Sequence, residues 1–256
     1  LDFTFLFDIF VSMICLLLSL FESSCFMAYN QFKVALEAAL KFFTNINLKE
    51  EQEICIRSLV LDRVDVLAVL PTGYGKSIIY QILAKVISGL RYNQIGERRT
   101  VTILVVSPLK QIRKQQVERL NARGIKSASL EDVHASDDTI LSEYEILFGS
   151  AEQWLSDIWL KNLKCGYLNK SEVLVVDDIH TIQTWGTGKK GKAAFRQAFG
   201  RINVLRSFLG NKPVLGLTAT ADESMRQQLC KHLNFKGHKE ILISRQTKYK
   251  IYSCKG

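Results

Sequence analysis

Apolar positions along this 256-residue chain follow two alternating patterns. Short continuous apolar runs predict buried strands, and apolar residues spaced every three or four positions predict amphipathic helices. Strands are expected at 66–69, 101–106, 172–176 and 213–217, with shorter ones at 124–130, 145–148 and 240–243. Helices are expected at 31–43, about 48–62, from 77 onward, 109–121, after 149–152, and at 199–209 and 225–233. Strands alternating with helices indicate an α/β fold, a mostly parallel sheet with helices on both faces.

The first long strand leads into a helix through a glycine-containing loop, in the stretch DVLAVLPTGYGKSIIYQ. Gly73 and Gly75 let the backbone approach an anion, and the N–H groups at the helix start point toward it. In such a phosphate loop Lys76 would reach the β- and γ-phosphates, and the Ser77 hydroxyl would hold Mg²⁺. The strict pattern has Gly at the position of Leu70, and an ordinary glycine turn before a helix is the alternative interpretation.

A later apolar strand ends on two adjacent acids, in the stretch VDDIH. Carboxylates at the C-terminal end of a parallel strand lie at the sheet edge where ligands bind. Asp177 there can hold the Mg²⁺ that bridges the phosphates, and Asp178 can orient or deprotonate the attacking water. A strand-ending turn with solvated acids is the plainer alternative. Thr218 and Thr220 follow the next strand, and their hydroxyls could hydrogen-bond these acids and couple nucleotide state to shape.

Charge is distributed unevenly along the chain. The net charge is +9, but residues 1–185 carry 19 Lys and Arg against 22 Asp and Glu, whereas residues 186–256 carry 15 against 3. The resulting +12 suggests a polyanionic partner, with a merely solvated basic face as the alternative. Around the loop TGKKGK, cations mix with aromatic residues, a composition suited to stacking bases and neutralising phosphates. The candidate nucleic-acid-binding residues, assigned to DNA by the resemblance described below, are Trp185, Lys189, Lys190, Lys192, Phe195 and Arg196.

Two other features limit the interpretation. The six cysteines show no C-x-x-C pair and no short metal-binding spacing, which suits free thiols in a reducing compartment.

Trp154 and Trp159 are expected in the core rather than as platforms for stacked bases.

The first 27 residues do not fit the pattern of the rest. Ile9 to Phe21 is a run of 13 residues without a charge, short of the roughly 18–20 that a membrane-spanning helix needs. The basic start of a signal peptide is missing too, since the first Lys or Arg is Lys33. Residues 1–27 are therefore interpreted as an apolar extension, either a gene-model or fragment edge or an N-terminal anchor. A membrane is not expected as a partner of the domain itself.

The order of the motifs resembles that of the RecQ-type superfamily 2 (DExH-box) DNA helicases over about residues 46–252. LPTGYGKSIIYQ is similar to that family's motif I, SPLKQIRKQQV to motif Ia, DDIH to motif II and TATA to motif III. WG and FRQAFGRINVLR resemble its aromatic-rich loop and the helix after it. LKEEQ resembles its adenine-reading motif, with Lys49 and Gln52 at the contact positions. The resemblance implies a RecA-like P-loop NTPase domain that binds ATP and Mg²⁺ and takes part in 3′-to-5′ unwinding of DNA.

The resemblance also implies roles for individual residues. Lys76, Asp177, Asp178 and His180 are the expected catalytic residues. His180, Thr218 and Thr220 are also expected to couple nucleotide state to the shape of the domain. Ser77 and Asp177 would hold Mg²⁺. The expected nucleotide-binding residues are Lys49, Gln52, Thr72, Gly73, Tyr74, Gly75, Lys76 and Ser77.

Several departures from the family pattern accompany the resemblance. Asp178 stands where the family has Glu, one methylene longer, and the loop between Gly186 and Phe195 has eight residues, more than in the family. The chain stops where the family's second RecA-like domain begins, and the zinc-binding module is absent. We therefore expect residues 28–243 to be a first motor domain, 244–256 the start of a linker, and the chain a fragment with little activity alone.

Two other functions remain open at this point. One is a non-catalytic module that binds ATP and DNA without turnover, and the other is a DExH RNA helicase-like ATPase. The expected partners are single-stranded DNA, duplex junctions and a second RecA-like domain. The expected location is the nucleus, on chromosomes, with the cytoplasm as the alternative.

Overall fold

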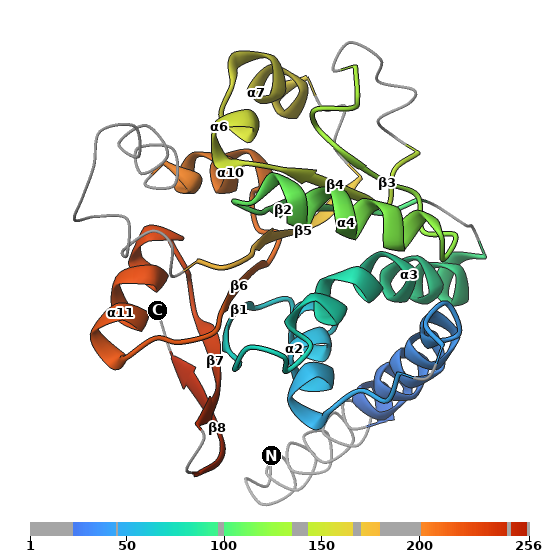
Figure 1. Ribbon diagram of the computed structural model, residues 1–256. Helices are drawn as coiled ribbons and strands as arrows, with labels where there is room; N and C mark the ends of the chain where they lie inside the picture. The colour runs from blue at the N-terminus through green and yellow to red at the C-terminus, as the bar shows by residue number, and fades with distance from the viewer. Residues whose placement is uncertain are drawn as a thin grey trace, which may run out of the picture.

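One eight-stranded sheet forms the centre of the molecule (Figure 1). The computed structural model describes residues 23–44, 46–96, 100–134, 143–165, 170–179, 201–244 and 247–254. The strand order is β3-β4-β2-β5-β6-β1-β7-β8, and every neighbouring pair is parallel except β7 and β8. The strands are β1 (Asp65–Val69), β2 (Thr102–Val106), β3 (Ser127–Ser129), β4 (Ile146–Gly149), β5 (Ser171–Val176), β6 (Val214–Thr218), β7 (His238–Ser244) and β8 (Thr247–Cys254). The predicted mostly parallel α/β sheet is confirmed.

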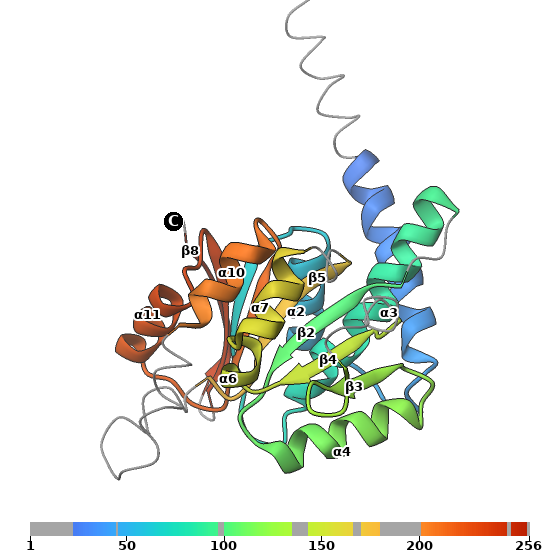
Figure 2. The ribbon, with the colours of Figure 1, turned by 90° about the horizontal axis from the view of Figure 1, so that it is seen from above.

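Helices cover both faces of this sheet (Figure 2). One face carries the helix of residues 23–40, α2 (Glu50–Val60), α3 (Lys76–Ile95) and α4 (Lys110–Asn121); the other carries α6 (Ala151–Trp154), α7 (Asp157–Lys164), α10 (Ile202–Leu209) and α11 (Glu223–His232). Successive residues of a strand point to opposite faces. In β2, Ile103 and Val105 accordingly join the first apolar cluster, whereas Leu104 and Val106 join the second.

Burial on both faces explains the continuous apolar runs in the sequence. Every residue of β1, β2, β4, β5 and β6 is buried, as expected for parallel strands between two helical layers. Trp154 and Trp159 lie in the second cluster with their rings 5.9 Å apart, edge to face. The Trp154 indole N–H donates to the Val105 carbonyl at 3.1 Å. The prediction that both tryptophans belong to the core is confirmed.

Both ends of the described chain differ from the sequence-based expectation. The described part of the first helix runs from residue 23 to residue 40, across the boundary expected at residue 27. Its buried face starts only at Phe32, as the spacing predicts. No helix in the described part of the chain is long and apolar enough to cross a membrane. At the other end, residues 247–254 were expected in a linker but form β8, antiparallel to β7. Lys248 and Lys250 suggested a solvated segment, yet lysines are also typical of edge strands.

A buried carboxylate fixes the start of β1, the strand that leads into the phosphate loop. Asp65 is 2% exposed, and its Oδ1 accepts hydrogen bonds from Arg206 Nη1 at 2.7 Å and from the Val214 backbone N–H at 2.8 Å. Its Oδ2 accepts from the Lys236 backbone N–H at 3.1 Å. One side chain thus joins β1 to α10, to the start of β6 and to the turn before β7.

Replacing Asp65 by Asn should destabilise the fold strongly. The substitution leaves the Arg206 guanidinium without its counter-charge in a nearly dry site, and breaking a buried pair from one side typically costs about 3–5 kcal/mol. The free energy of unfolding from urea titration should therefore fall by about 3 kcal/mol or more. Glu143→Gln is the matched control, because its partner Lys126 and Glu143 itself are 66% and 60% exposed, and such pairs contribute less than about 1 kcal/mol. Equal effects of the two substitutions would contradict the role given to Asp65.

Candidate nucleotide-binding site

The glycine loop lies at the carboxyl end of β1 and leads directly into α3. Gly73 and Gly75 have φ of +81° and +87°, a region in which L side chains are strained. A Cβ added at Gly73 would meet no atom within 4 Å, so the space against this part of the loop is open. The α3 N-cap, Gly75, provides no side-chain cap to the first N–H groups of the helix. Open backbone, uncapped donors and the adjacent Lys76 fit a phosphate group.

The two acids follow β5 at the same edge of the sheet. Asp177 is 7% exposed, and its Oδ1 accepts the backbone N–H of Asp178 at 3.0 Å. Burial and the neighbouring charge of Asp178 raise the pKa of Asp177 to about 6, although the Asp178 N–H and the Lys76 ammonium oppose the rise. An ionised Asp177 is therefore poorly compensated by protein groups, which favours a cation as its partner.

Strand β6 holds the loop and the acids in register, because it lies between β1 and β5. The Leu70 N–H donates to the Thr218 carbonyl at 2.9 Å, and the Ile179 N–H donates to the Leu217 carbonyl at 3.0 Å. The end of one strand therefore binds both the phosphate loop and the turn that carries the acids. The Thr218 hydroxyl donates to the Thr220 carbonyl at 3.0 Å, and not to an acid of the neighbouring strand as expected. A local turn offers this hydroxyl a nearer acceptor.

The start of α2 packs against the outer side of the loop. Gln52 is 4% exposed, and its amide N–H₂ donates to the carbonyls of Tyr74 at 2.9 Å and Gly75 at 3.1 Å. Its Oε1 accepts the Lys49 N–H at 2.8 Å. The Lys49 ammonium lies 3.6 Å from the centre of the Tyr74 ring, a cation–π contact. The two residues expected to read adenine thus support the loop, and their role toward a base stays a prediction.

Three side chains around the site were not singled out from the sequence. The Tyr80 hydroxyl lies 3.4 Å from Asp177 Oδ2, and its place one turn after Lys76 is a signal that could have identified it. The Gln116 amide lies 3.4 Å from the Ser77 hydroxyl. Glu51 accepts a hydrogen bond from the Tyr74 hydroxyl. Because Gln116 and Glu51 approach from other helices, no local spacing reveals them.

The remaining predicted residues divide into two groups. Thr72 and Gly73 are exposed on the loop, whereas Lys76 and Ser77 are half-buried at the start of α3. The others lie outside the described residues, and their roles stay predictions: His180, Trp185, Lys189, Lys190, Lys192, Phe195 and Arg196.

The donor set suits a hard divalent cation next to a phosphate. The hydroxyl of Ser77 and the carboxylate of Asp177 are oxygen ligands of the kind that Mg²⁺ takes from proteins, alongside substrate phosphates and waters. The side chains of Ser77 and Asp177 both interact with the Tyr80 hydroxyl. These residues fit Mg²⁺ and are the ones that would hold it.

The sheet order, the glycine loop and the acids define a RecA-like P-loop domain. The family profile of the DEAD/DEAH box helicases matches residues 49–228. The chain belongs to the DEAD/DEAH box helicase family.

Curated relatives support the RecQ-type resemblance. The chain is 32% identical over 203 residues to the probable ATP-dependent DNA helicase RecS of Bacillus subtilis, covering 74% of this chain and 35% of that protein. It is 30% identical over 215 residues to the ATP-dependent DNA helicase RecQ of Haemophilus influenzae, covering 81% of this chain and 31% of RecQ. The chain thus spans about a third of the length of these relatives.

Solved structures agree on the fold. The helicase MrfA bound to DNA superposes with a TM-score of 0.58 at 19% identity, over 80% of this chain and 29% of MrfA. The Pyrococcus furiosus Hef helicase domain superposes with a TM-score of 0.50 at 16% identity, over 75% of this chain and 38% of Hef. At such identities the likeness shows the architecture alone.

The raised pKa of Asp177 predicts how stability depends on pH in metal-free buffer. Between about pH 4 and pH 6 the folded chain keeps a proton on Asp177 that the unfolded chain releases, so the free energy of unfolding falls as pH rises through this window. Asp177→Asn removes the effect. At pH 7 the variant should be more stable than the parent by about 2–3 kcal/mol, given about 1.36 kcal/mol per pKa unit, with almost no difference at pH 4.

Urea titrations at the two pH values in the presence of a chelator measure this. Replacement of the exposed Asp132 by Asn is the control, and it should change the free energy of unfolding equally at pH 4 and pH 7. A difference between parent and Asp177→Asn that does not depend on pH would rule out the proposed ionisation.

Proposed function

We propose that this chain is the ATP-hydrolysing motor domain of a RecQ-type DNA helicase, which couples ATP turnover to 3′-to-5′ unwinding. The observation that carries the proposal is the joint placement of Lys76, Ser77 and Asp177 by three adjacent strand ends. Membership of the DEAD/DEAH family supports use of a nucleotide. The printed names of RecS and RecQ, both ATP-dependent DNA helicases, support DNA rather than RNA as the partner.

Each residue of the site has a defined task in this proposal. The backbone N–H groups from Gly73 to Ser77 bind the phosphates, and the Lys76 ammonium neutralises charge that grows on the γ-phosphate during transfer. Ser77 and Asp177 would hold Mg²⁺, which when bound neutralises charge between the β- and γ-phosphates. Asp178 would orient the attacking water and accept its proton. The nearby Lys76 helps to keep Asp177 ionised at neutral pH.

DNA would lie against the basic part of the chain. Residues 186–256 carry 15 Lys and Arg against 3 Asp and Glu, and contacts with phosphates release counterions from nucleic acid. The aromatic and cationic residues from Trp185 to Arg196 are proposed to contact single-stranded DNA. Work on chromosomes in the nucleus, in DNA repair and recombination, follows from the same proposal.

ATP hydrolysis measured with and without single-stranded DNA tests the function. The parent chain should release phosphate faster when DNA is present, whereas Lys76→Ala should lose nucleotide affinity by at least about tenfold, because a charge-assisted hydrogen bond contributes about 1.5–3 kcal/mol. A fluorescent ATP analogue measures the affinity, and Lys41→Ala, which removes an exposed lysine outside the site, is the control. Unchanged affinity in Lys76→Ala would remove the phosphate-loop assignment. Turnover that stays indifferent to DNA when this domain is joined to a second RecA-like domain would remove the helicase assignment.

Asp178→Glu should change little in the isolated chain, but it should raise the DNA-stimulated turnover when this domain is joined to a second RecA-like domain. The extra methylene moves the carboxylate about 1.5 Å closer to where the family places its water-activating Glu, and a misplacement of about 1 Å can change rates about 100-fold. We expect an increase in kcat of about tenfold with little change in KM. Asp178→Asn, which keeps the shorter side chain without its basicity, should instead lower kcat. If the Glu and Asn variants behaved alike, Asp178 would have no part in activating water.

A further inference from the structure

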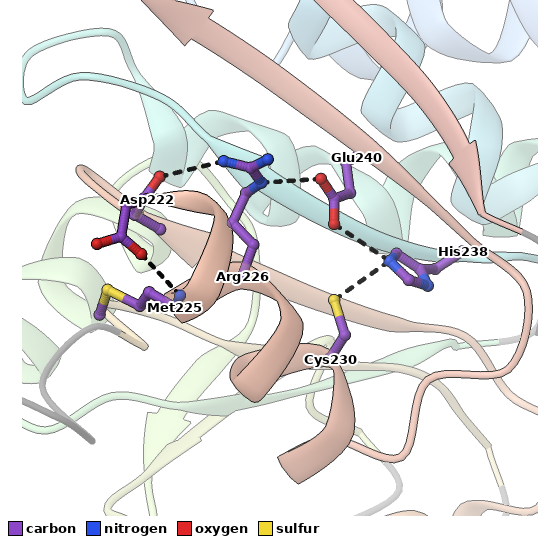
Figure 3. A network of polar contacts seen from close by, with 7 residues as sticks. Asp222, Met225, Arg226, Cys230, His238 and Glu240 are labelled. Carbon is purple, nitrogen blue, oxygen red and sulfur yellow. Dashed lines mark hydrogen bonds and ion pairs between the residues drawn. The ribbon is translucent and has the colours of Figure 1, made fainter.

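A second cluster of metal-ligating side chains lies on the other side of β1, away from the phosphate loop's acids. It comprises Cys230 on α11 with His238 and Glu240 on β7 (Figure 3). Cys230 Sγ lies 3.2 Å from His238 Nε2, and this nitrogen lies 3.5 Å from Glu240 Oε1. The three ligand atoms all lie within 4.8 Å of one another, and Cys230 and Glu240 are buried.

Two of these separations are close to the edges of a tetrahedral zinc site. Zn²⁺ binds thiolate sulfur at about 2.3 Å and imidazole nitrogen or carboxylate oxygen at about 2.0–2.2 Å, so neighbouring ligand atoms lie about 3.4–3.6 Å apart. The nitrogen–oxygen separation of 3.5 Å falls in that range, and the sulfur–nitrogen separation of 3.2 Å lies slightly below it. Sulfur, nitrogen and one carboxylate oxygen also form a donor set that selects zinc-like ions over Mg²⁺ or Ca²⁺.

The carboxylate is held in place by a neighbour on α11. Arg226 Nε donates to Glu240 Oε2 at 2.9 Å, which leaves Oε1 directed at His238, as Figure 3 shows. The same guanidinium reaches the Ala221 carbonyl at 3.5 Å through Nη1. Metal ligands are commonly oriented by such outer partners, which fix the geometry before the ion arrives.

A fourth candidate ligand comes from β8. Cys254 is directly opposite His238 in the antiparallel ladder, and paired residues of this kind have Cβ atoms about 4.5–5.5 Å apart on one face. Both residues line the same cavity of about 490 Å³, together with Cys230 and Glu240. The spacing C-x₇-H-x-E-x₁₃-C is unlike that of short zinc motifs, so these residues are not recognisable as a metal site from spacing alone.

We propose that Cys230, His238 and Glu240 bind one Zn²⁺ ion, with Cys254 as the fourth ligand. The ion would join α11 to the β7–β8 hairpin and so fix the edge of the sheet next to β1. A thiol that only hydrogen-bonds the imidazole is the competing explanation of the short sulfur–nitrogen contact. The proposal is independent of the helicase function, because it concerns a structural site built from other residues.

Metal titration of the full chain tests the proposal. Protein freed of metal with a chelator and kept reduced should bind one equivalent of Zn²⁺, measured by competition with a chromophoric indicator. Co²⁺ in its place should give a thiolate charge-transfer band and the visible bands of tetrahedral cobalt. Bound Zn²⁺ should also raise the Tm, since the ion binds only the folded site.

Ligand variants then identify the residues. Loss of an outer-shell partner typically costs 10–100-fold in metal affinity, so Cys230→Ser and His238→Gln should each cost at least about 100-fold. The controls are Cys165→Ser and His232→Gln, which change exposed residues of the same types and should leave the affinity unchanged. An unaltered affinity in Cys254→Ser would overturn the fourth ligand alone.

Two results would overturn the site as a whole. One is a Co²⁺ complex of the parent chain without a thiolate band, a result that needs no variant to fold. The other is zinc affinity that is equally retained, or equally lost, in the ligand variants and the controls. Circular dichroism of each metal-free variant separates loss of ligand from loss of fold.

Discussion

The position of β1 is the constraint on which the nucleotide site depends. Asp65 fixes the start of this strand by binding an arginine of α10 and two backbone N–H groups, those of Val214 and Lys236. Because β1 is only five residues long, a shift at its start would be carried to the phosphate loop at its end. A buried ion pair adds little net stability, but it restricts the geometry of the residues around it. The restriction arises because either charge, buried without its partner, is strongly unfavourable. Here it sets the register of β1, β6 and β7 together.

The same parallel register explains why the chemistry collects at one edge of the sheet. The ends of β1, β6 and β5 lie side by side, so the loop with Lys76 and the turn with Asp177 meet across the Thr218 segment. Burial, together with the neighbouring charge of Asp178, raises the pKa of Asp177 to about 6. The ionised form of Asp177 is therefore electrostatically unfavourable without a cation beside it, a condition common at functional sites.

Much of the fold and of the nucleotide site could be predicted from local sequence. The contacts between elements distant in the chain could not, for a physical reason. The strands, the glycine loop and the acids after β5 follow from periodicity and turn chemistry, which act over a few residues. The contacts of the Gln52 amide and the Cys230–His238 contact depend on which surfaces meet in three dimensions. The lysines of residues 247–254 predict a solvated linker, whereas these residues form β8 by pairing with β7. Pairing with a neighbouring strand cannot be inferred from local sequence.

Asp178 shows how backbone and chemistry compete at a single position. Its φ is +51°, in the left-handed region that costs most L-residues roughly 1–2 kcal/mol and that Asp and Asn tolerate best. Asp is tolerated in this region better than Glu, so it suits the turn better. The same substitution withdraws the carboxylate from the water it would activate. The backbone conformation of the turn thus favours Asp, whereas activation of the water favours the longer Glu. This chain has Asp at this position.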